Sequence, residues 1–343
     1  MPCTVVVCGF FGDTGKGKVI SYLALKDNID LAVRGGVGPN ACHTVVFKGH
    51  KYEMRMLPSA FVNERCRLLI GPGVLVDPDR FLEEVEMVKA HGRAGLDPQC
   101  AIIEPRHKEM DRKGHLREKI VTMGSGCGPC NADRAMRVAK LARDEPRLRE
   151  FLTDVPLEVN QALDEGKKVI LEGTQGTFLS LYHGTYPYVT SKDVTASAIC
   201  SDVGIGPTKV DDVIVVFKAF VTRVSPGPLP GELSQEEAER RGWVEIETVG
   251  PLAGQMRRVA PFNFDLAKRA VMLNGATQVA LTKIDLLFPE CAGAREFDEL
   301  SADARKFVLK VEKALGVPVS LVGTGPGVEE MVDRRYELGL KKD

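Results

Sequence analysis

The chain has few aromatic residues, no excess of either charge and no long apolar run. It contains one tryptophan among 343 residues, and Lys+Arg 46 against Asp+Glu 47 leave a formal net charge of −1. This balance argues against a broad nucleic-acid surface, although a local basic pocket remains possible. No stretch approaches membrane-spanning length, and the start shows neither a basic segment nor a cleavage site. We therefore expect small-molecule substrates, no nucleic acid or membrane partner, and a cytoplasmic location.

The nine cysteines do not form a secreted disulfide framework, because their number is odd and they are scattered along the chain. One pair, Cys127-Gly128-Pro129-Cys130, has the form of a thioredoxin-like redox motif and gives one interpretation, a dithiol oxidoreductase. However, Gly124, Gly126 and Gly128 surround the pair and no tryptophan precedes it. These features favour a backbone-lined anion loop over a redox site.

The segment 5–18 lacks a complete Walker P-loop. It joins an apolar run to a glycine-rich turn that ends in Gly15-Lys16-Gly17-Lys18, and a helix is expected to follow. Such a turn presents backbone N–H groups to phosphate. The Walker pattern fails because Val19 takes the position of the required hydroxyl residue. The sequence therefore predicts a different phosphate loop, with Asp13 inside it.

Short β-branched runs alternate with amphipathic segments. The expected strands are residues 4–8, 67–70, 101–104, 168–171, 213–217, 278–281 and 318–322, and the expected helices are 79–90, 132–143, 264–273 and 302–315. This alternation predicts an α/β fold, a largely parallel central sheet with helices on both faces. For helix 132–143 we expect Asn131 as the N-cap and a buried stripe through Ala132, Ala135, Met136 and Ala139. No linker divides the chain, so we expect one elaborated domain over residues 1–343.

A second block, 34–44, places His43 in a glycine-rich turn where it could donate to a phosphoryl oxygen or act as a general acid. Together with the loop 12–18, the run Asn40-Ala41-Cys42-His43-Thr44 resembles the adenylosuccinate synthetase family. Seven further blocks fit the family in order: Thr122 with 124–129, Arg137, 172–176, 183–191, 222–224, 282–285 and 324–326. The resemblance therefore extends over residues 12–326 and implies an adenylosuccinate-synthetase-like fold.

The resemblance implies a Mg²⁺-dependent ligase that phosphorylates O6 of a 6-oxopurine nucleotide, after which L-aspartate displaces the phosphate. It assigns catalysis to Asp13 and His43, and metal binding to Asp13 and the Cys42 carbonyl. It assigns the triphosphate to Gly12, Thr14, Gly15, Lys16, Gly17, Lys18 and Thr44, and the purine nucleotide to Asn40, Thr122, Met123, Arg137, Gln175, Thr190, Val224 and Gln255. Aspartate is assigned to Gly254, Gln255, Arg257 and Arg258, and the donor base to Lys283, Asp285, Gly323, Thr324, Gly325 and Pro326. A homodimer is implied, in which Arg137 reaches the partner subunit's site.

Departures from the family pattern suggest a particular substrate. The segment 252–258 keeps only the last two of four arginines, and Gln255 replaces an arginine near the ribose 2′-hydroxyl. A nucleotide without that hydroxyl loses less binding free energy by this change than a ribonucleotide does. With Thr14 and Cys42, the substitution resembles the bacteriophage branch, whose members act on dGMP, and it predicts dGMP and location in a host cytoplasm. The overall length and the run 191–196 look archaeal instead, and Asp13 is retained where the viral branch can carry serine.

Alternatives of three kinds, in substrate, donor and class of protein, stay open from the sequence. Within the family, the protein could be an adenylosuccinate synthetase that uses IMP. The donor is equally open, because Asp285 favours GTP whereas the viral branch resembles users of ATP or dATP. From other classes, the chain could be a nucleotide-binding protein with reduced catalysis or the dithiol oxidoreductase.

Overall fold

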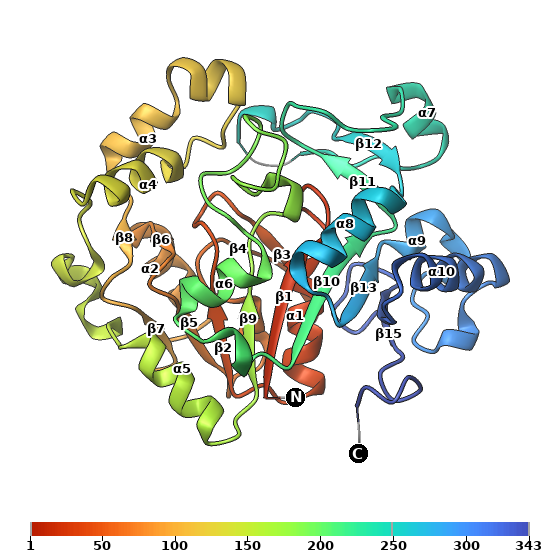
Figure 1. Ribbon diagram of the computed structural model, residues 1–343, viewed down its shortest axis with the longest axis horizontal. Coiled ribbons are helices and arrows are strands. Elements are labelled where there is room, and N and C mark those ends of the chain that lie inside the picture. The colour runs from red at the N-terminus through yellow and green to blue at the C-terminus, as the bar shows by residue number, and fades with distance from the viewer. Residues whose placement is uncertain (1, 248–249, 342–343) are drawn as a thin grey trace.

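The core of the structure, a computed structural model that describes residues 2–247 and 250–341, is a mainly parallel sheet (Figure 1). Within the described residues this sheet has nine strands, and each pair of neighbours is parallel except β14 and β15. In spatial order the strands are β15 (Met331–Asp333), β14 (Val319–Gly323), β13 (Gln278–Thr282), β10 (Asp212–Lys218), β1 (Cys3–Cys8), β9 (Val169–Glu172), β2 (Leu31–Arg34), β5 (Arg67–Ile70) and β7 (Ala94–Leu96).

The described residues also form three small two-stranded sheets and ten α-helices. The small sheets are β3 (His43–Phe47) with β4 (His50–Met54), β6 (Leu75–Val76) with β8 (Ala101–Ile102), and β11 (Phe220–Arg223) with β12 (Arg258–Pro261). The helices are α1 (Lys16–Lys26), α2 (Pro78–Met87), α3 (Pro105–Asp111), α4 (Cys127–Met136), α5 (Val155–Asp164), α6 (Ala196–Val203), α7 (Gln235–Arg240), α8 (Phe264–Asn274), α9 (Ile284–Leu287) and α10 (Ala302–Leu315). None of these helices is both long and apolar enough to span a bilayer.

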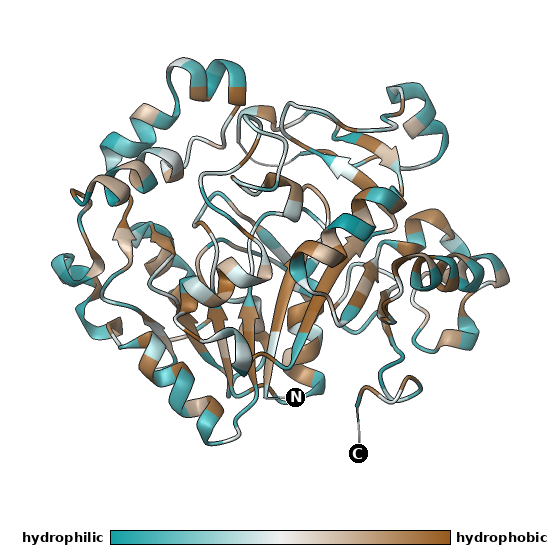
Figure 2. Cartoon of the chain, viewed as in Figure 1, coloured by the Kyte–Doolittle hydropathy of each residue, from teal (hydrophilic) through white to brown (hydrophobic). Residues whose placement is uncertain are grey.

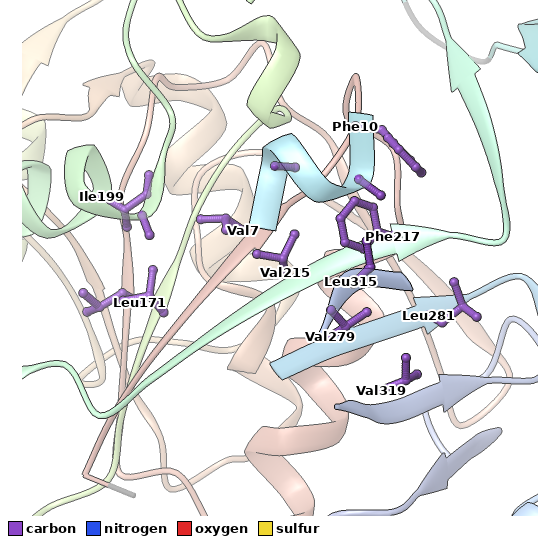
Figure 3. Close-up of a cluster of buried hydrophobic side chains, with 14 of the residues drawn as sticks. Val7, Phe10, Leu171, Ile199, Val215, Phe217, Val279, Leu281, Leu315 and Val319 are labelled. Atoms are coloured by element: carbon purple, nitrogen blue, oxygen red, sulfur yellow. The ribbon is translucent and has the colours of Figure 1, made fainter. Parts of the chain in front are cut away.

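Both faces of the sheet are buried, which follows from the alternation of side chains along each strand. In β1, Val5 and Val7 belong to one apolar cluster, whereas Val6 belongs to the cluster on the opposite face. The first cluster joins the strands to α5, α6, α8 and α10, and Figure 3 shows Val7, Val215 and Ile199 meeting within it. The second packs α1 and α2 against the other face. Figure 2 shows the consequence, since the central strands are hydrophobic while the outer helices mix both kinds of residue.

The predicted α/β class and the parallel sheet with helices on both faces are confirmed. Two local predictions are wrong. Residues 101–104 were expected in the main sheet, but only Ala101–Ile102 form a strand, and they pair with β6 outside it. The helix expected over 132–143 is α4, which begins at Cys127 and ends at Met136.

The cap and the buried stripe predicted for this helix are also wrong. Gly126 in the left-handed region is the N-cap, and Asn131 lies inside α4, where it donates to Ser191 Oγ. Ala132, Ala135 and Met136 are exposed, and Ala139 lies beyond the helix. α4 is instead anchored by Cys127, Pro129, Cys130 and Asp133.

Candidate functional site

The loop between β1 and α1 has the backbone of an anion-binding turn. Gly12, Asp13 and Gly15 all have positive φ, at 92°, 55° and 78°. A Cβ on Gly176, in the loop after β9, would lie 2.3 Å from Gly12 N, so only glycine permits the two loops to approach this closely. The carboxyl ends of β1 and β9 thus bring their loops together, as expected for a ligand crevice in a parallel sheet.

The side chains of the phosphate loop divide into two groups. Asp13 is 39% exposed, whereas Thr14, Lys16, Gly17 and Lys18 are buried. Lys16 Nζ donates to Gln175 O at 2.8 Å, and burial lowers the pKa of Lys16. Among the described residues this ammonium is bonded to a carbonyl and paired with no carboxylate, which suits an incoming anion.

His43, at the start of β3, is buried in a charged network with Arg34 and Glu172. Arg34 Nη1 donates to Glu172 Oε1 at 2.6 Å, and His43 Nδ1 contacts the same oxygen. The second carboxylate oxygen accepts from Ser59 N at 2.6 Å. His43 Nδ1 also lies 2.8 Å from Arg34 Nη1. The carboxylate of Glu172 can only accept, so its contact favours a proton on Nδ1 and leaves Nε2 without one in the neutral ring.

The charges of this network follow from burial. Burial, together with Arg34, lowers the pKa of His43 to about 3 although Glu172 opposes the shift. For Glu172, burial alone would raise the pKa, but Arg34 and the His43 hydrogen bond outweigh it and lower the pKa to about 2. His43 is therefore neutral near pH 7 without a ligand. A phosphate placed at Nε2 would favour the imidazolium, which could then donate to it.

Acid is expected to destabilise the protein through this pair. An unfolded histidine gains its proton near pH 6.5 and folded His43 only near about pH 3, so the unfolded state binds more protons between these values and stability falls as pH falls through that window. Glu172 acts in the same direction between pH 4.5 and about pH 2. Thermal melts from above pH 6.5 down to pH 4.5 should show a smaller loss of Tm for His43→Asn than for wild type. Equal losses would contradict the assignment.

Asp13 is held by two cations from distant segments. Lys218, at the end of β10 and only 1% exposed, contacts Asp13 Oδ2 at 3.2 Å and Glu245 Oε2 at 2.6 Å. Arg257 contacts the same Asp13 oxygen as well as Glu245 and Glu247. Both cations use Oδ2, so Asp13 Oδ1 makes neither contact. Burial acts to lower the pKa of Lys218, but Asp13 and Glu245 outweigh it and raise the pKa.

Three residues that the resemblance assigns to the purine nucleotide form a connected group. Gln175 Nε2 donates to Asn40 Oδ1 at 3.0 Å, and Asn40 Nδ2 donates to Thr190 Oγ1 at 3.3 Å. This group adjoins the phosphate loop through the Lys16 contact with the Gln175 carbonyl. The three residues lie 15 to 150 positions apart along the chain, so only the fold could show that they meet.

Most of the other assigned nucleotide and aspartate residues line two cavities. One, of about 410 Å³, is lined by Val224, Gln255, Arg257 and Arg258 among others. Arg258 is also paired with Glu232, and Gly254 and Gln255 are exposed. The second cavity, of about 390 Å³, is lined by Thr122 and Met123 among others. Arg137 is exposed at the C-cap of α4 and does not line either cavity.

The residues assigned to the donor base lie after β13 and β14, which are neighbouring strands. Lys283 contacts Glu245 Oε1 at 3.4 Å, and burial raises the pKa of Asp285. Lys18 Nζ donates to the carbonyls of Gly325 and Glu330 at 2.5 and 2.6 Å, so it joins α1 to the loop that holds Gly323, Thr324, Gly325 and Pro326. Burial lowers the pKa of Lys18 to about 8. Thr44 is exposed in β3.

Four of the predicted site residues carry a buried polar atom with no hydrogen-bond partner in the part of the chain that the structure describes. These atoms are Thr14 Oγ1, His43 Nε2, Gln175 Oε1 and Asp285 Oδ1. Buried polar groups are normally hydrogen-bonded, and an orphaned one calls for an explanation. A polar ligand that reaches all four would supply the missing partners.

The residues present fit a magnesium ion that arrives with phosphate groups. No cluster of three or more His, Cys, Asp or Glu side chains that could hold a metal occurs within residues 2–247 and 250–341. Mg²⁺ commonly takes one or two carboxylates and completes its shell with water and phosphate oxygens. Asp13 supplies such a carboxylate and Cys42 a backbone carbonyl, whereas burial raises the pKa of the Cys42 thiol and keeps it from being a thiolate ligand.

Sequence reasoning missed Lys218, Glu245 and Glu247, and it gave no role to Arg34 and Glu172. A usable signal existed for two of them, because Lys218 and Glu172 are charged residues at the carboxyl ends of strands that face the crevice. Glu245 and Glu247 gave no such signal, since they lie in a segment without regular structure. The Cys127–Cys130 pair is buried, and burial raises the pKa of both thiols to about 12, which does not support a redox role.

Comparison with known proteins identifies the family. The sequence profile described as adenylosuccinate synthetase matches residues 5–145 and 138–291. The chain is 54% identical to the adenylosuccinate synthetase of Archaeoglobus fulgidus and 55% identical to that of Thermococcus onnurineus, over 98% of this chain and 99% and 100% of theirs. The fold matches the fully ligated adenylosuccinate synthetase of Plasmodium falciparum with a TM-score of 0.90 at 24% identity, over 97% of this chain and 100% of that chain.

These findings overturn the predicted bacteriophage branch and its substrate dGMP. The cyanophage S-2L succinoaminodeoxyadenylate synthetase bound to dGMP and dATP shares the fold, with a TM-score of 0.80 over 98% of this chain and 97% of that chain, but only 25% of the sequence. The archaeal relatives share more than twice that fraction and are named adenylosuccinate synthetase. The chain belongs to the adenylosuccinate synthetase family and is a purine-biosynthetic ligase that forms a carbon–nitrogen bond with a nucleoside triphosphate.

Proposed function

We propose that this protein condenses L-aspartate with IMP at the expense of GTP to give adenylosuccinate. The observation that carries the proposal is 51–55% identity over 98% of the chain to archaeal proteins named adenylosuccinate synthetase. The site supplies what the reaction needs, namely a carboxylate, a buried histidine and a phosphate loop at one crevice. GTP replaces ATP and dATP as the proposed donor, because Asp285 presents an acceptor suited to guanine.

In the first step, Asp13 would take the N1 proton of IMP, so that O6 attacks the γ-phosphorus of GTP. The O6–P bond forms, the bond to the β-phosphate oxygen breaks, and GDP leaves. Lys218 and Arg257, which contact Asp13 Oδ2, hold the carboxylate at the crevice, and Oδ1 is left to meet the base. In the second step the aspartate amine would attack C6 and displace phosphate.

His43 and Lys16 would stabilise the phosphoryl group during its transfer. His43 Nε2 is buried without a partner, and Glu172 orients the ring from the other side. Once protonated, Nε2–H would donate to a phosphoryl oxygen while Glu172 balances the imidazolium. Lys16, buried beside Gln175, would add positive charge.

The remaining assignments are part of the same proposal. Asn40, Gln175 and Thr190 would hold the purine nucleotide, and Arg257 would exchange its contact with Glu245 or Glu247 for the carboxylate of the aspartate substrate. Asp13 and the Cys42 carbonyl would hold Mg²⁺. When bound, the metal would offset the charge of the phosphates.

We also propose that the protein acts as a homodimer in which Arg137 enters the site of the partner subunit. Arg137 has a φ of 66° at the C-cap of α4 and is exposed. Its neighbours Met136 and Val138 are both 63% exposed. Two exposed apolar side chains that flank an arginine suit a contact surface.

The test is a substrate comparison with the purified protein, L-aspartate and Mg²⁺. IMP and dGMP are each offered with GTP and with ATP, and products are identified by mass spectrometry. We expect adenylosuccinate from IMP and GTP, with kcat/KM for IMP above that for dGMP by at least about 100-fold, because dGMP lacks the 2′-hydroxyl and a site that bonds this group would leave its polar partner unpaired. Equal or better use of dGMP would refute the proposed substrate.

A further inference from the structure

The two arginines of a basic cavity beside the start of α4 have no role in the assignments above. Its lining residues are Arg112, Arg117, Thr122, Met123, Gly124 and Pro251, and its volume is about 390 Å³. Thr122 and Met123 are two of the residues assigned to the purine nucleotide. The two arginines come from the exposed segment between α3 and this loop and were not singled out by the sequence.

The charge of this cavity is not balanced by the protein. Neither Arg112 nor Arg117 forms an ion pair with any residue in the described ranges 2–247 and 250–341. The segment 112–119 has four basic residues, Arg112, Lys113, Arg117 and Lys119, and one acidic residue, Glu118. The whole chain, by contrast, has a formal net charge of −1. Guanidinium groups without carboxylate partners beside a cavity suit an anionic ligand.

The wall of the cavity is held in place by hydrogen bonds. Arg112 Nε donates to Gly124 O at 3.2 Å, and Thr122 Oγ1 donates to Asp111 O at 2.9 Å. Asp111 Oδ2 in turn accepts from Gly126 N at 2.8 Å, just before α4 begins. The loop that carries Thr122 is therefore tied to α3, which places both arginines against it.

The residues that line the neighbouring cavity indicate which anion the basic cavity would bind. Pro251 borders the basic cavity, and the next residue, Leu252, borders the cavity of about 410 Å³. Gln255, Arg257 and Arg258, the residues assigned to L-aspartate, all line that second cavity. The amino acid is therefore assigned to the second cavity and the triphosphate to the loop 12–18, so the basic cavity is left for the remaining anionic group of the reactants.

We propose that Arg112 and Arg117 bind the 5′-phosphate of the purine nucleotide from within the same chain. The inference rests on the proposed function, because it names the substrate IMP. A phosphate monoester is a dianion that two guanidinium forks can bind in a bidentate manner. Recognition of the phosphate is then shared between these residues and any arginine that a partner subunit contributes.

The experiment compares Arg112→Ala, Arg117→Ala and the double variant with Lys113→Ala and Lys119→Ala, which remove equal charge from the same segment outside the cavity. Affinities for IMP and for inosine are measured by calorimetry, and KM values for IMP and aspartate by initial rates. We expect each arginine variant to weaken IMP binding by about tenfold and the double variant by about 100-fold, since each lost charge-assisted contact contributes about 1.5 kcal/mol. Inosine binding, kcat and the lysine variants should stay within about twofold of wild type.

The outcomes separate this inference from the proposed function. If wild type converts IMP but the double variant binds IMP as tightly as wild type, the inference fails alone. If KM for aspartate rises instead of KM for IMP, the cavity binds the amino acid and the inference is wrong. If wild type binds IMP in an arginine-dependent manner without converting it, the proposed function fails and the phosphate site stands.

Discussion

The Asp13→Asn protein is expected to fold as wild type does and to lose turnover by at least about 10³-fold. General-base catalysis contributes roughly 10² to 10⁴ in rate. An amide cannot take the N1 proton of a 6-oxopurine, so O6 would remain a weak nucleophile. The loss should appear in kcat and not only in KM, because the proton transfer belongs to the chemical step.

The fold should tolerate this substitution for two reasons. Asp13 has a φ of 55°, and asparagine is among the few residues that adopt this region readily. Asp13 is also 39% exposed, so the change does not leave an uncompensated charge in the core. Lys218 keeps Glu245 as a partner at 2.6 Å, and Arg257 keeps Glu245 and Glu247.

The first measurement is steady-state turnover with IMP, GTP and L-aspartate. The second is positional isotope exchange in GTP, in which the oxygen that bridges the β- and γ-phosphates exchanges with the non-bridging oxygens of the β-phosphate. That exchange reports phosphoryl transfer to O6 without any need for aspartate. Asp79→Asn is the matched control, because Asp79 also pairs with an arginine, Arg147, at 2.6 Å but lies on the surface in α2. Near-normal exchange in a folded Asp13→Asn protein would remove Asp13 as the base.

The parts of the fold that depend on local pattern could be predicted. The β-branched runs gave the central strands, and residues 302–315 matched α10 because Ser301 caps the helix and Gly316 ends it. The turn before α1 was predictable, because its glycines permit the positive φ that Gly12 and Gly15 adopt. The start of α4 was predicted wrongly, because it depends on Gly126 and on the hydrogen bond from Gly126 N to Asp111 of α3. A contact between two segments leaves no pattern in the local sequence.

The position of Lys218 at a strand end marks it as a crevice residue, but its pairing with Asp13 could not be predicted, because that pairing depends on long-range contacts. Lys218 and Asp13 lie 205 positions apart, and Arg257 and Asp13 lie 244 apart. A lone lysine at a strand end and a glutamate in an irregular segment carry no spacing that relates them to the phosphate loop. Their meeting follows from the adjacency of β1 and β10, which is a property of the strand order.

The error about the substrate has a different origin. It rested mainly on Gln255, with Thr14 and Cys42 beside it, and Gln255 is exposed at the edge of a cavity. Replacing an exposed side chain does not leave a buried polar group unpaired. The identity of residue 255 therefore says little about whether the bound nucleotide carries ribose or deoxyribose. The overall length, which looks archaeal, agrees with the comparisons, whereas the retained Asp13 fits either substrate.

Asp285→Asn is expected to lower kcat/KM for GTP by about 10³-fold and to make XTP the better donor. Asp285 Oδ1 is buried and has no hydrogen-bond partner among the described residues. It lies after β13, near the carboxyl ends of the strands, where Lys18 contacts the loop after β14. A carboxylate there can accept from both N1–H and the 2-amino group of guanine. An asparagine would set its own N–H against that amino group, and a buried mismatch of this kind is rejected by about 10⁴-fold.

Xanthine reverses the pattern, since it keeps N1–H but carries an oxygen at C2. The asparagine amide would donate to that oxygen and accept from N1–H, so activity should return with XTP. Initial rates with each donor, at saturating IMP and aspartate, give the comparison, and Asp298→Asn provides an exposed carboxylate in the same region as a control. The rescue by XTP distinguishes base recognition from damage to the fold, because a misfolded loop would bind neither donor. A variant that uses GTP as well as wild type does would show that Asp285 does not face the base.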